Sequence, residues 1–329
     1  MTEHPELSFP FPEMPAFGEV VEVADGIIWL RIPLPYRLDH VNIYLIRDHG
    51  GWAVIDTGIR TDEAIAAWDA YFAGPLKGFT ITKVIVTHHH PDHIGLAGRM
   101  CDRFDAPLLT TYSAYMGSKV ISLGANERQT RSNFDFYTSH GMSSEVAGVV
   151  AIQGNEYLRR VGELPGSFLR LLMPDFLEIG ERSFRVLTGD GHAHEQLLLY
   201  CEADKLLFAA DQVIEKISPN ISVFADERNG DPLGHFLRSL RFLSAEIPPD
   251  VLVLPGHRLP FYGLQARCAE LEAHHEERCD RVRAACTKAP MTVAELVPIL
   301  FPRELDPHQM SFAFTETLAH VNRLVRRGE

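Results

Sequence analysis

The sequence predicts an α/β fold built on a mixed sheet, with a small helical domain after it. Short apolar runs alternate with helical patterns over most of the chain, which is typical of α/β proteins. Two of these runs flank Asp48-His49-Gly50-Gly51, a turn sequence that joins antiparallel strands. Beyond residue 262 the apolar residues recur every three or four positions, as they do on one face of a helix.

The composition is that of an ordinary globular protein, with 46% hydrophobic and 23% charged residues among 329. The net charge of −13 argues against nonspecific binding to nucleic acid or to an anionic membrane. The five cysteines lack a CxxC pair and favour packing thiols in a reducing compartment. Neither a signal-peptide pattern nor an apolar run near the ~18 residues of a membrane span is evident, so we expect a cytoplasmic protein.

An irregular, proline-rich arm is expected over residues 1–18, followed by a catalytic domain over 19–262. The strands are predicted at residues 26–32, 41–46, 52–56, 83–87, 108–110, 183–187, 196–201, 205–210 and 251–254. The helices of this domain are predicted at about residues 61–72, 94–104 and 232–244.

Residues 112–177 are an insertion whose helical periodicity is weak. Long insertions near a site often form lids or substrate walls, and a helical pair packed on the scaffold is an equally good interpretation. The two interpretations are compatible.

The C-terminal domain is expected over residues 263–329. Its first helix carries an apolar stripe made of Leu264, Cys268, Leu271, His275, Cys279, Val282 and Cys286. Thr292 and Glu295 form a capping box that opens a second helix, and a third helix ends in a basic cluster. These features suggest a helical or winged-helix-like domain. The neighbouring Glu276 and Glu277 predict that His274 and His275 lie on a solvated face.

The strand at 83–87 ends in an unusually polar stretch, His88-His89-His90-Pro91-Asp92-His93. So many ionisable side chains would repel or desolvate one another without a cation. Imidazole and carboxylate suit zinc, iron and manganese. In an extended segment His88 and His90 point the same way, so one ion can take this pair while a second takes Asp92 and His93.

Three further strands end in a small residue followed by a ligand type. They lead to His192 and His194, to Asp211 and to His257. Small residues let the backbone approach a metal closely. Each of these strand ends is weak evidence alone, but together with the histidine stretch they predict one metal centre.

These motifs, in this order, resemble the metallo-β-lactamase superfamily and are similar to its glyoxalase II-like hydrolases over about residues 20 to 260. The resemblance implies a four-layer αβ/βα sandwich and two divalent ions, with zinc favoured over iron or manganese. It implies that one ion is held by His88, His90 and His192, the other by Asp92, His93 and His257, with Asp211 bridging both. Asp56, in the Asp-Thr-Gly motif of the fold, would orient a ligand imidazole.

The chain also departs from family patterns. True metallo-β-lactamases have a cysteine in place of the bridging aspartate and lack the Asp92-His93 pair, so β-lactam cleavage is not expected. The basic glutathione-binding residues of glyoxalase II cannot be matched beyond Arg258. Ala193-His194 replaces the usual Ser/Thr-Pro, which leaves His194 as a competitor of the favoured ligand His192. The tail is similar to the winged-helix domain of some members, including an RNA-cleaving branch.

We therefore expect a metal-dependent hydrolase in which a metal-bridging hydroxide attacks the carbonyl of a small thioester, ester or lactone. Asp92 is placed to give the leaving group a proton, and Asp211 completes the catalytic pair. An RNA or phosphodiester nuclease is the alternative, and it requires a basic groove. A binding protein with structural metals would need closed coordination shells. No membrane partner is expected, nucleic acid is disfavoured, and a homodimer is left open.

Overall fold

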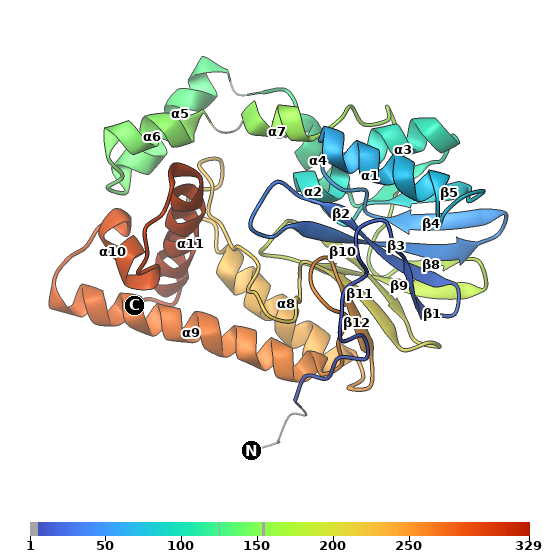
Figure 1. Cartoon of the computed structure of the whole chain (residues 1–329). Helices are drawn as coiled ribbons and strands as arrows, with labels where there is room; N and C mark the ends of the chain where they lie inside the picture. The colour runs from blue at the N-terminus through green and yellow to red at the C-terminus, as the bar shows by residue number, and fades with distance from the viewer. Residues whose placement is uncertain (1–5, 125, 153–154) are drawn as a thin grey trace.

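The computed structural model describes residues 6–124, 126–152 and 155–329. Two sheets form the centre of the molecule (Figure 1). The first has the order β1-β2-β3-β4-β5-β6-β7 and the second the order β12-β11-β10-β9-β8. The strands of the first sheet are β1 (Val21–Ala24), β2 (Ile27–Pro33), β3 (His40–Asp48), β4 (Gly51–Ile55), β5 (Ile81–Ile85), β6 (Leu108–Thr110) and β7 (Leu169–Arg170). Those of the second are β8 (Phe176–Ile179), β9 (Arg182–Gly189), β10 (Gln196–Cys201), β11 (Leu206–Ala210) and β12 (Leu252–Pro255).

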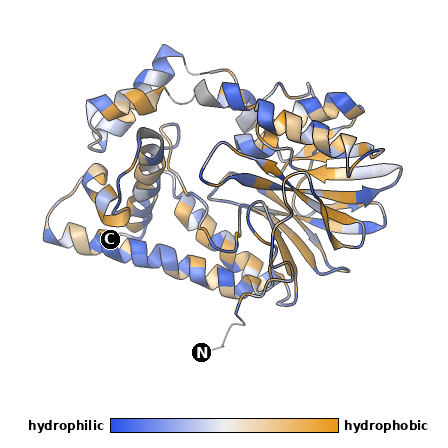
Figure 2. Ribbon diagram, in the orientation of Figure 1, coloured by the Kyte–Doolittle hydropathy of each residue, from blue (hydrophilic) through white to orange (hydrophobic). Residues whose placement is uncertain are grey.

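The strands are buried on both faces because their side chains alternate between two apolar layers. Along β3, Ile43 and Leu45 pack toward the helices, whereas Tyr44 and Ile46 pack against the second sheet. The same alternation occurs in β10, where Leu198 faces away from the first sheet. Figure 2 shows the resulting hydrophobic colouring along the strands.

Helices cover the outer face of each sheet. The helices beside the first sheet are α1 (Asp62–Ala73), α2 (Pro91–Ile94) and α3 (Ala97–Phe104). The second sheet is covered by α8 (Pro232–Glu246), whose buried Leu233, Phe236, Leu237 and Leu240 join its core. The layers therefore run helix, sheet, sheet, helix, which confirms the predicted four-layer αβ/βα sandwich.

The insertion forms four helices, namely α4 (Tyr112–Ile121), α5 (Glu127–Ser139), α6 (Ser144–Ala151) and α7 (Asn155–Arg160). Its helices α5 and α6 lie apart from the sheets and beside the C-terminal region (Figure 1). The last part of the chain consists of α9 (Leu264–Lys288), α10 (Val293–Leu300) and α11 (Pro307–Arg326). The predicted capping box is confirmed at α10, where Thr292 and Glu295 exchange hydrogen bonds. All regular elements described in this region are helices, so a winged-helix relation stays a prediction.

The structure corrects four sequence-based expectations. The helix predicted at 94–104 is two helices, because Gly95 and Leu96 separate α2 from α3. Strands β1, β7 and β8 were not predicted, since they are only two to four residues long. His275 is fully buried rather than solvated, while its neighbour His274 is partly exposed. Cys286, placed on the apolar stripe of α9, is exposed.

Among the described residues, no helix combines the length and the apolar character needed to cross a membrane. The first five residues of the predicted N-terminal arm lie outside the described part of the chain. The rest of that arm follows an irregular path, and Ser8 forms a short antiparallel bridge with Tyr262.

Candidate metal centre

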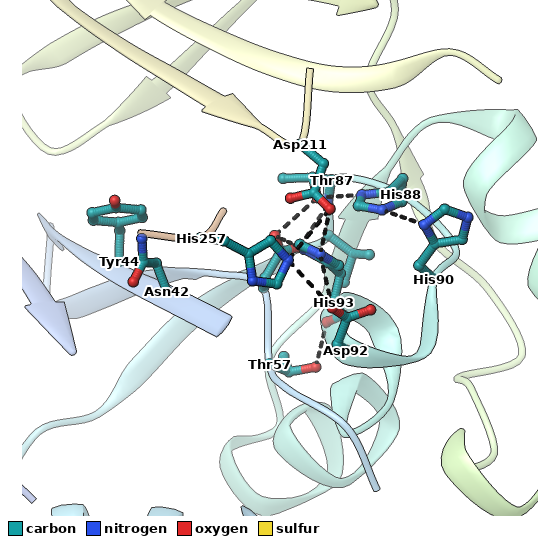
Figure 3. A network of polar contacts seen from close by, with 12 residues as sticks. Asn42, Tyr44, Thr57, Thr87, His88, His90, Asp92, His93, Asp211 and His257 are labelled. Carbon is teal, nitrogen blue, oxygen red and sulfur yellow. Dashed lines mark hydrogen bonds and ion pairs between the residues drawn. The ribbon is translucent and has the colours of Figure 1, made fainter. Parts of the chain in front are cut away.

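The polar stretch after β5 folds as a tight entry into α2. Pro91 is the first residue of this helix, where its missing N–H costs nothing. Asp92 and His93 therefore lie on the helix, whereas His88 and His90 lie on the extended segment before it. This change of direction brings side chains from both parts toward one point (Figure 3).

The predicted ligands meet in three overlapping groups. In each group the candidate ligand atoms lie within 4.8 Å of one another. The groups are His88, His90 and His192; His88, His93 and Asp211; and Asp92, His93 and His257. The loop after β5 thus meets ligands from the ends of three strands of the other sheet, β9, β11 and β12.

Asp211 occupies the centre of the arrangement. Its Oδ2 atom lies 3.4 Å from the Nε2 atoms of His93, His192 and His257. Two ligands at ~2.1 Å from one tetrahedral ion lie about 3.4 Å apart. The carboxylate of Asp211 therefore faces both sets of imidazoles at the spacing expected of shared coordination.

The unpaired atoms of the site favour a cation. His93 Nε2, His192 Nε2 and Asp211 Oδ1 are buried, and within the described part of the chain they make no hydrogen bond. Buried polar atoms almost always have partners, so three unpaired ones at one point indicate a missing partner. The donor set of neutral imidazoles and carboxylates is the one that zinc, iron and manganese accept. The residues present therefore fit a pair of divalent ions.

The pKa values reflect the same need for positive charge. Burial would lower the pKa of His257, but the carboxylates of Asp211 and Asp92 outweigh it and raise that pKa to about 10. Burial and the neighbouring imidazoles hold the pKa of His88 well below its usual range. In the metal-free protein, protons on His93 and His257 thus balance the buried carboxylates.

Hydrogen bonds from outside the groups orient the imidazoles. Asp56 accepts a hydrogen bond from His93 Nδ1 at 2.8 Å and another from the backbone N–H of Thr87 at 2.8 Å. His257 Nδ1 donates to the carbonyl of His40 at 2.8 Å, and His192 Nδ1 donates to that of Asn220, also at 2.8 Å. These bonds hold a proton on each Nδ1 atom, so that each Nε2 atom presents its lone pair to the centre once it carries no proton.

The backbone is strained and crowded where it approaches the centre. Asp56, Ala210 and Arg258, all beside or within the site motifs, have positive φ angles of 61°, 44° and 68°. A Cβ atom at Gly256 would lie 2.3 Å from Asp211 Oδ1, so only glycine fits there. Strain of this kind is concentrated at functional sites.

His194 is separated from the groups that contain His192. Its side chain is 69% exposed and lies 3.6 Å from Glu227. The geometry therefore places His192, and not His194, with His88 and His90. His89 is also outside the groups, and its carbonyl accepts a hydrogen bond from Tyr157 of α7 at 2.6 Å. A Cβ atom at Gly117 of α4 would contact the His89 ring, so the insertion borders the histidine loop.

The sequence offered no clear signal for several supporting groups. Thr87 directly precedes the ligands, and its hydroxyl bridges Asp56 and the ring of His88. His40 and Asn220 act through backbone carbonyls, which every residue type possesses. Only the three-dimensional contacts identify such residues.

Comparisons with known proteins agree with this geometry. A family model described as "Metallo-beta-lactamase superfamily" matches residues 36–257, and one described as "Metallo-beta-lactamase-like, C-terminal domain" matches residues 279–329. The chain therefore belongs to the metallo-β-lactamase superfamily. Its histidine and aspartate groups are typical of the dinuclear metal site of that superfamily.

Individual relatives span different parts of the chain. A crystal structure of a beta-lactamase domain protein from Burkholderia ambifaria is 40% identical, with a TM-score of 0.90, over 98% of this chain and 94% of that chain. The probable metallo-hydrolase YqjP of Bacillus subtilis is 25% identical over 91% of this chain and 92% of its own length. A hydroxyacylglutathione hydrolase from Bradyrhizobium is 26% identical, but over only 50% of this chain and 48% of its own length.

Proposed function

We propose that this protein is a dinuclear metal-dependent hydrolase that cleaves a small thioester, ester or lactone. The observation that carries the proposal is the position of Asp211, at 3.4 Å from imidazoles of both ligand sets. When bound, two divalent ions, zinc in the first instance, would supply an ionised water and polarise the oxygen of the electrophile. The names of the relatives from Bacillus and Bradyrhizobium support hydrolysis as the reaction class.

The side chains of the site divide the remaining tasks. His88, His90 and His192 would hold one ion, and Asp92, His93 and His257 would hold the other. Asp92 is 21% exposed, whereas Asp211 is 8% exposed. The carboxylate of Asp92 therefore reaches the substrate side, and we assign it the transfer of a proton from the attacking water to the leaving group. Asp211 remains ionised between the two sets, since its neighbouring imidazoles outweigh burial and lower its pKa.

The nuclease alternative receives less support from the charged surface. A cavity of about 400 Å³ between α8 and α11 is lined by Arg238, Arg241, Arg323 and Arg326. These arginines already serve the fold: Arg323 lies 2.9 Å from Asp231, and Arg241 lies 2.8 Å from Glu272. Acidic Asp231 and Glu227 line the same cavity. A phosphodiester backbone would meet a surface of mixed positive and negative charge there. An acyl substrate is therefore the better supported proposal.

The test is a hydrolysis panel of acyl-CoA, acyl-glutathione, homoserine lactone and RNA, run with zinc-, iron- and manganese-loaded protein. His90→Ala and Asp211→Ala should each remove nearly all activity toward the accepted substrate, because each opens a ligand set. His194→Ala is the matched control and should keep wild-type activity, since this exposed imidazole lies outside the groups. Activity that persists in His90→Ala and Asp211→Ala would refute the metal mechanism, and cleavage of RNA alone would refute the acyl substrate.

A further inference from the structure

A second buried cluster of ligand-type residues lies between α9 and α11, outside the metal centre. It consists of His275, Glu316 and His320, whose candidate ligand atoms all lie within 4.8 Å of one another. Both imidazoles are fully buried and Glu316 is 8% exposed. By residue type alone, the cluster could be mistaken for a third metal site.

The hydrogen bonds of the two imidazoles in this cluster are complete without a cation. His320 Nδ1 donates to the carbonyl of Glu316 at 2.8 Å, which leaves His320 Nε2 to accept from His275 Nδ1 at 3.2 Å. His275 Nε2 then accepts from the hydroxyl of Ser218 at 3.1 Å. Arg278 lies 3.3 Å from the Glu316 carboxylate and supplies the positive charge. The metal centre differs, because His93 Nε2 and His192 Nε2 there have no hydrogen-bond partner in the described structure.

The cluster instead fixes one segment of the catalytic domain. Residues 218–223 belong to the connection between β11 and α8, which runs beside α11 (Figure 1). Besides the Ser218 contact, Asn220 Nδ2 donates to Glu316 Oε2 at 3.0 Å. The hydroxyls of Ser222 and Thr315 lie 2.8 Å apart, and the N–H of Val223 donates to the carbonyl of Thr315. Four contacts within six residues therefore attach this segment to the C-terminal helices.

The same segment carries the group that orients a metal ligand. The carbonyl of Asn220 accepts the hydrogen bond from His192 Nδ1 at 2.8 Å. This bond determines that the lone pair of His192 lies on Nε2, toward Asp211. A single residue, Asn220, therefore connects Glu316 of α11 to the His192 imidazole through two hydrogen bonds.

We propose that the C-terminal helices position the metal ligand His192 through Glu316 and Asn220. Glu316 and Asn220 are positioning residues: they touch neither the reacting atoms nor the ions. The proposal rests on the dinuclear centre proposed above, and it is independent of the substrate. It gives the C-terminal region a role in assembling the site, since the carbonyl that orients His192 is held in place by α11.

The experiment measures metal binding by the full-length protein. Metal-free wild type, Asn220→Ala, Glu316→Ala and Glu316→Gln are titrated with Co²⁺ against a chromophoric chelator, and the absorption spectrum of the bound Co²⁺ is recorded. Outer hydrogen-bond partners of metal ligands contribute roughly tenfold to a hundredfold in affinity. We expect about tenfold weaker binding of one of two ions in both alanine variants, with an altered spectrum. Glu316→Gln gives up the ion pair with Arg278 but should bind metal nearly as wild type, because its amide oxygen still accepts from Asn220.

Leu318→Ala is the control for general loss of stability. Leu318 is a buried core residue of α11, and its truncation loosens the helix without removing a hydrogen bond of the 218–223 segment. Unchanged affinity in both alanine variants would overturn the proposal, and so would an equal loss in Leu318→Ala. A wild-type protein that binds fewer than two ions would overturn the dinuclear centre itself, together with this inference. A loss confined to Asn220→Ala and Glu316→Ala would support it.

Discussion

Asp56 should determine which ring nitrogen of His93 carries a proton, and the substitution Asp56→Asn tests this. Asp56 Oδ1 accepts from the backbone N–H of Thr87, while Oδ2 accepts from His93 Nδ1 and from the Thr87 hydroxyl. These contacts are buried. In Asp56→Asn, the amide oxygen must stay on the Thr87 N–H, because the amide nitrogen cannot accept from it. The amide nitrogen then faces His93 Nδ1.

This exchange should reverse the tautomer of His93. An N–H from the new amide would donate to Nδ1, so the ring proton would move to Nε2, the atom that faces Asp211 and Asp92. Nε2 could then no longer offer a lone pair to a metal. Loss of an outer carboxylate costs about 10- to 100-fold in metal affinity, which corresponds to about 1.4 to 2.7 kcal/mol. The backbone should tolerate the change, because asparagine adopts the positive φ of 61° at this position.

The assay is a competition titration of Zn²⁺ with a chromophoric chelator, paired with urea unfolding of the metal-free protein. Asp48→Asn is the matched control, since it makes the same change at a buried carboxylate that binds Lys83 and Thr82 instead. Asp48 lies at the far end of β3 from His40, on the order of 25 Å away along the strand. We expect weaker metal binding in Asp56→Asn only. Two ions bound with wild-type affinity by Asp56→Asn would refute the tautomer argument.

Three further predictions concern pH, metal loading and packing. Burial would raise the pKa of Asp48, but hydrogen bonds from Lys83 and Thr82 outweigh it and hold the pKa at about 2. Because the folded pKa lies below the unfolded one, this stabilisation exists above pH ~4 and disappears toward pH 2. In urea unfolding over that interval, the free energy of unfolding of metal-free wild type should fall by about 2 kcal/mol more than that of Asp48→Asn. Equal losses in the two proteins would contradict the pairing of Asp48 with Lys83 and Thr82. The pKa of His257 is raised to about 10, since nearby carboxylates outweigh burial, and the pKa of His93 is raised likewise. Zn²⁺ binding at pH 8 should therefore release about two protons per chain from these imidazoles, beyond the one lost by the ionised water. Calorimetry in buffers of different ionisation enthalpy measures this release, and its absence would show that the imidazoles are already neutral. Gly191→Ala should destabilise the fold by about 3 kcal/mol or more, because the residue has a φ of 105° and its Cβ would lie 2.4 Å from that of Phe236; an unchanged melting temperature would contradict this.

The sequence predicted that these imidazoles and carboxylates lie together, because the energetic cost of placing them side by side is local. Adjacent imidazoles and carboxylates at the end of an apolar strand have no satisfactory arrangement without a cation, whatever the fold. The same reasoning applied to Asp211 and His257, each of which follows a buried strand and a small residue. It favoured His192 but left His194 as a competitor, since that choice depends on how the turn after Gly189 places each ring. The structure separates them by exposure and by contact with Asp211.

Other features were beyond sequence reasoning because they depend on which surfaces meet. His275 was assigned to a solvated face because Glu276 and Glu277 follow it, although its place on the apolar stripe of α9 indicated the burial that the structure shows. Strand β7 pairs only two residues with β6, too short a run to show a period of two. The role of Asn220 comes from a backbone carbonyl, for which the side-chain identity carries no signal.

The position of the centre explains why its ligands are so widely separated in the sequence. His88 to His93 follow a strand of the first sheet, whereas His192, Asp211 and His257 follow strands of the second. The faces of the sheets that meet are joined mainly by apolar side chains, such as Tyr44 against Phe208, and beside the centre by hydrogen bonds from Asn42 and Tyr44 to the carbonyl of Pro255. Apolar packing is non-directional, so it tolerates small sliding movements. Coordination fixes distances within a few tenths of an ångström. A bound pair of ions would therefore add to these hydrogen bonds in holding the two sheets in register at this edge, with Asp211, which lies close to both ligand sets, at the centre.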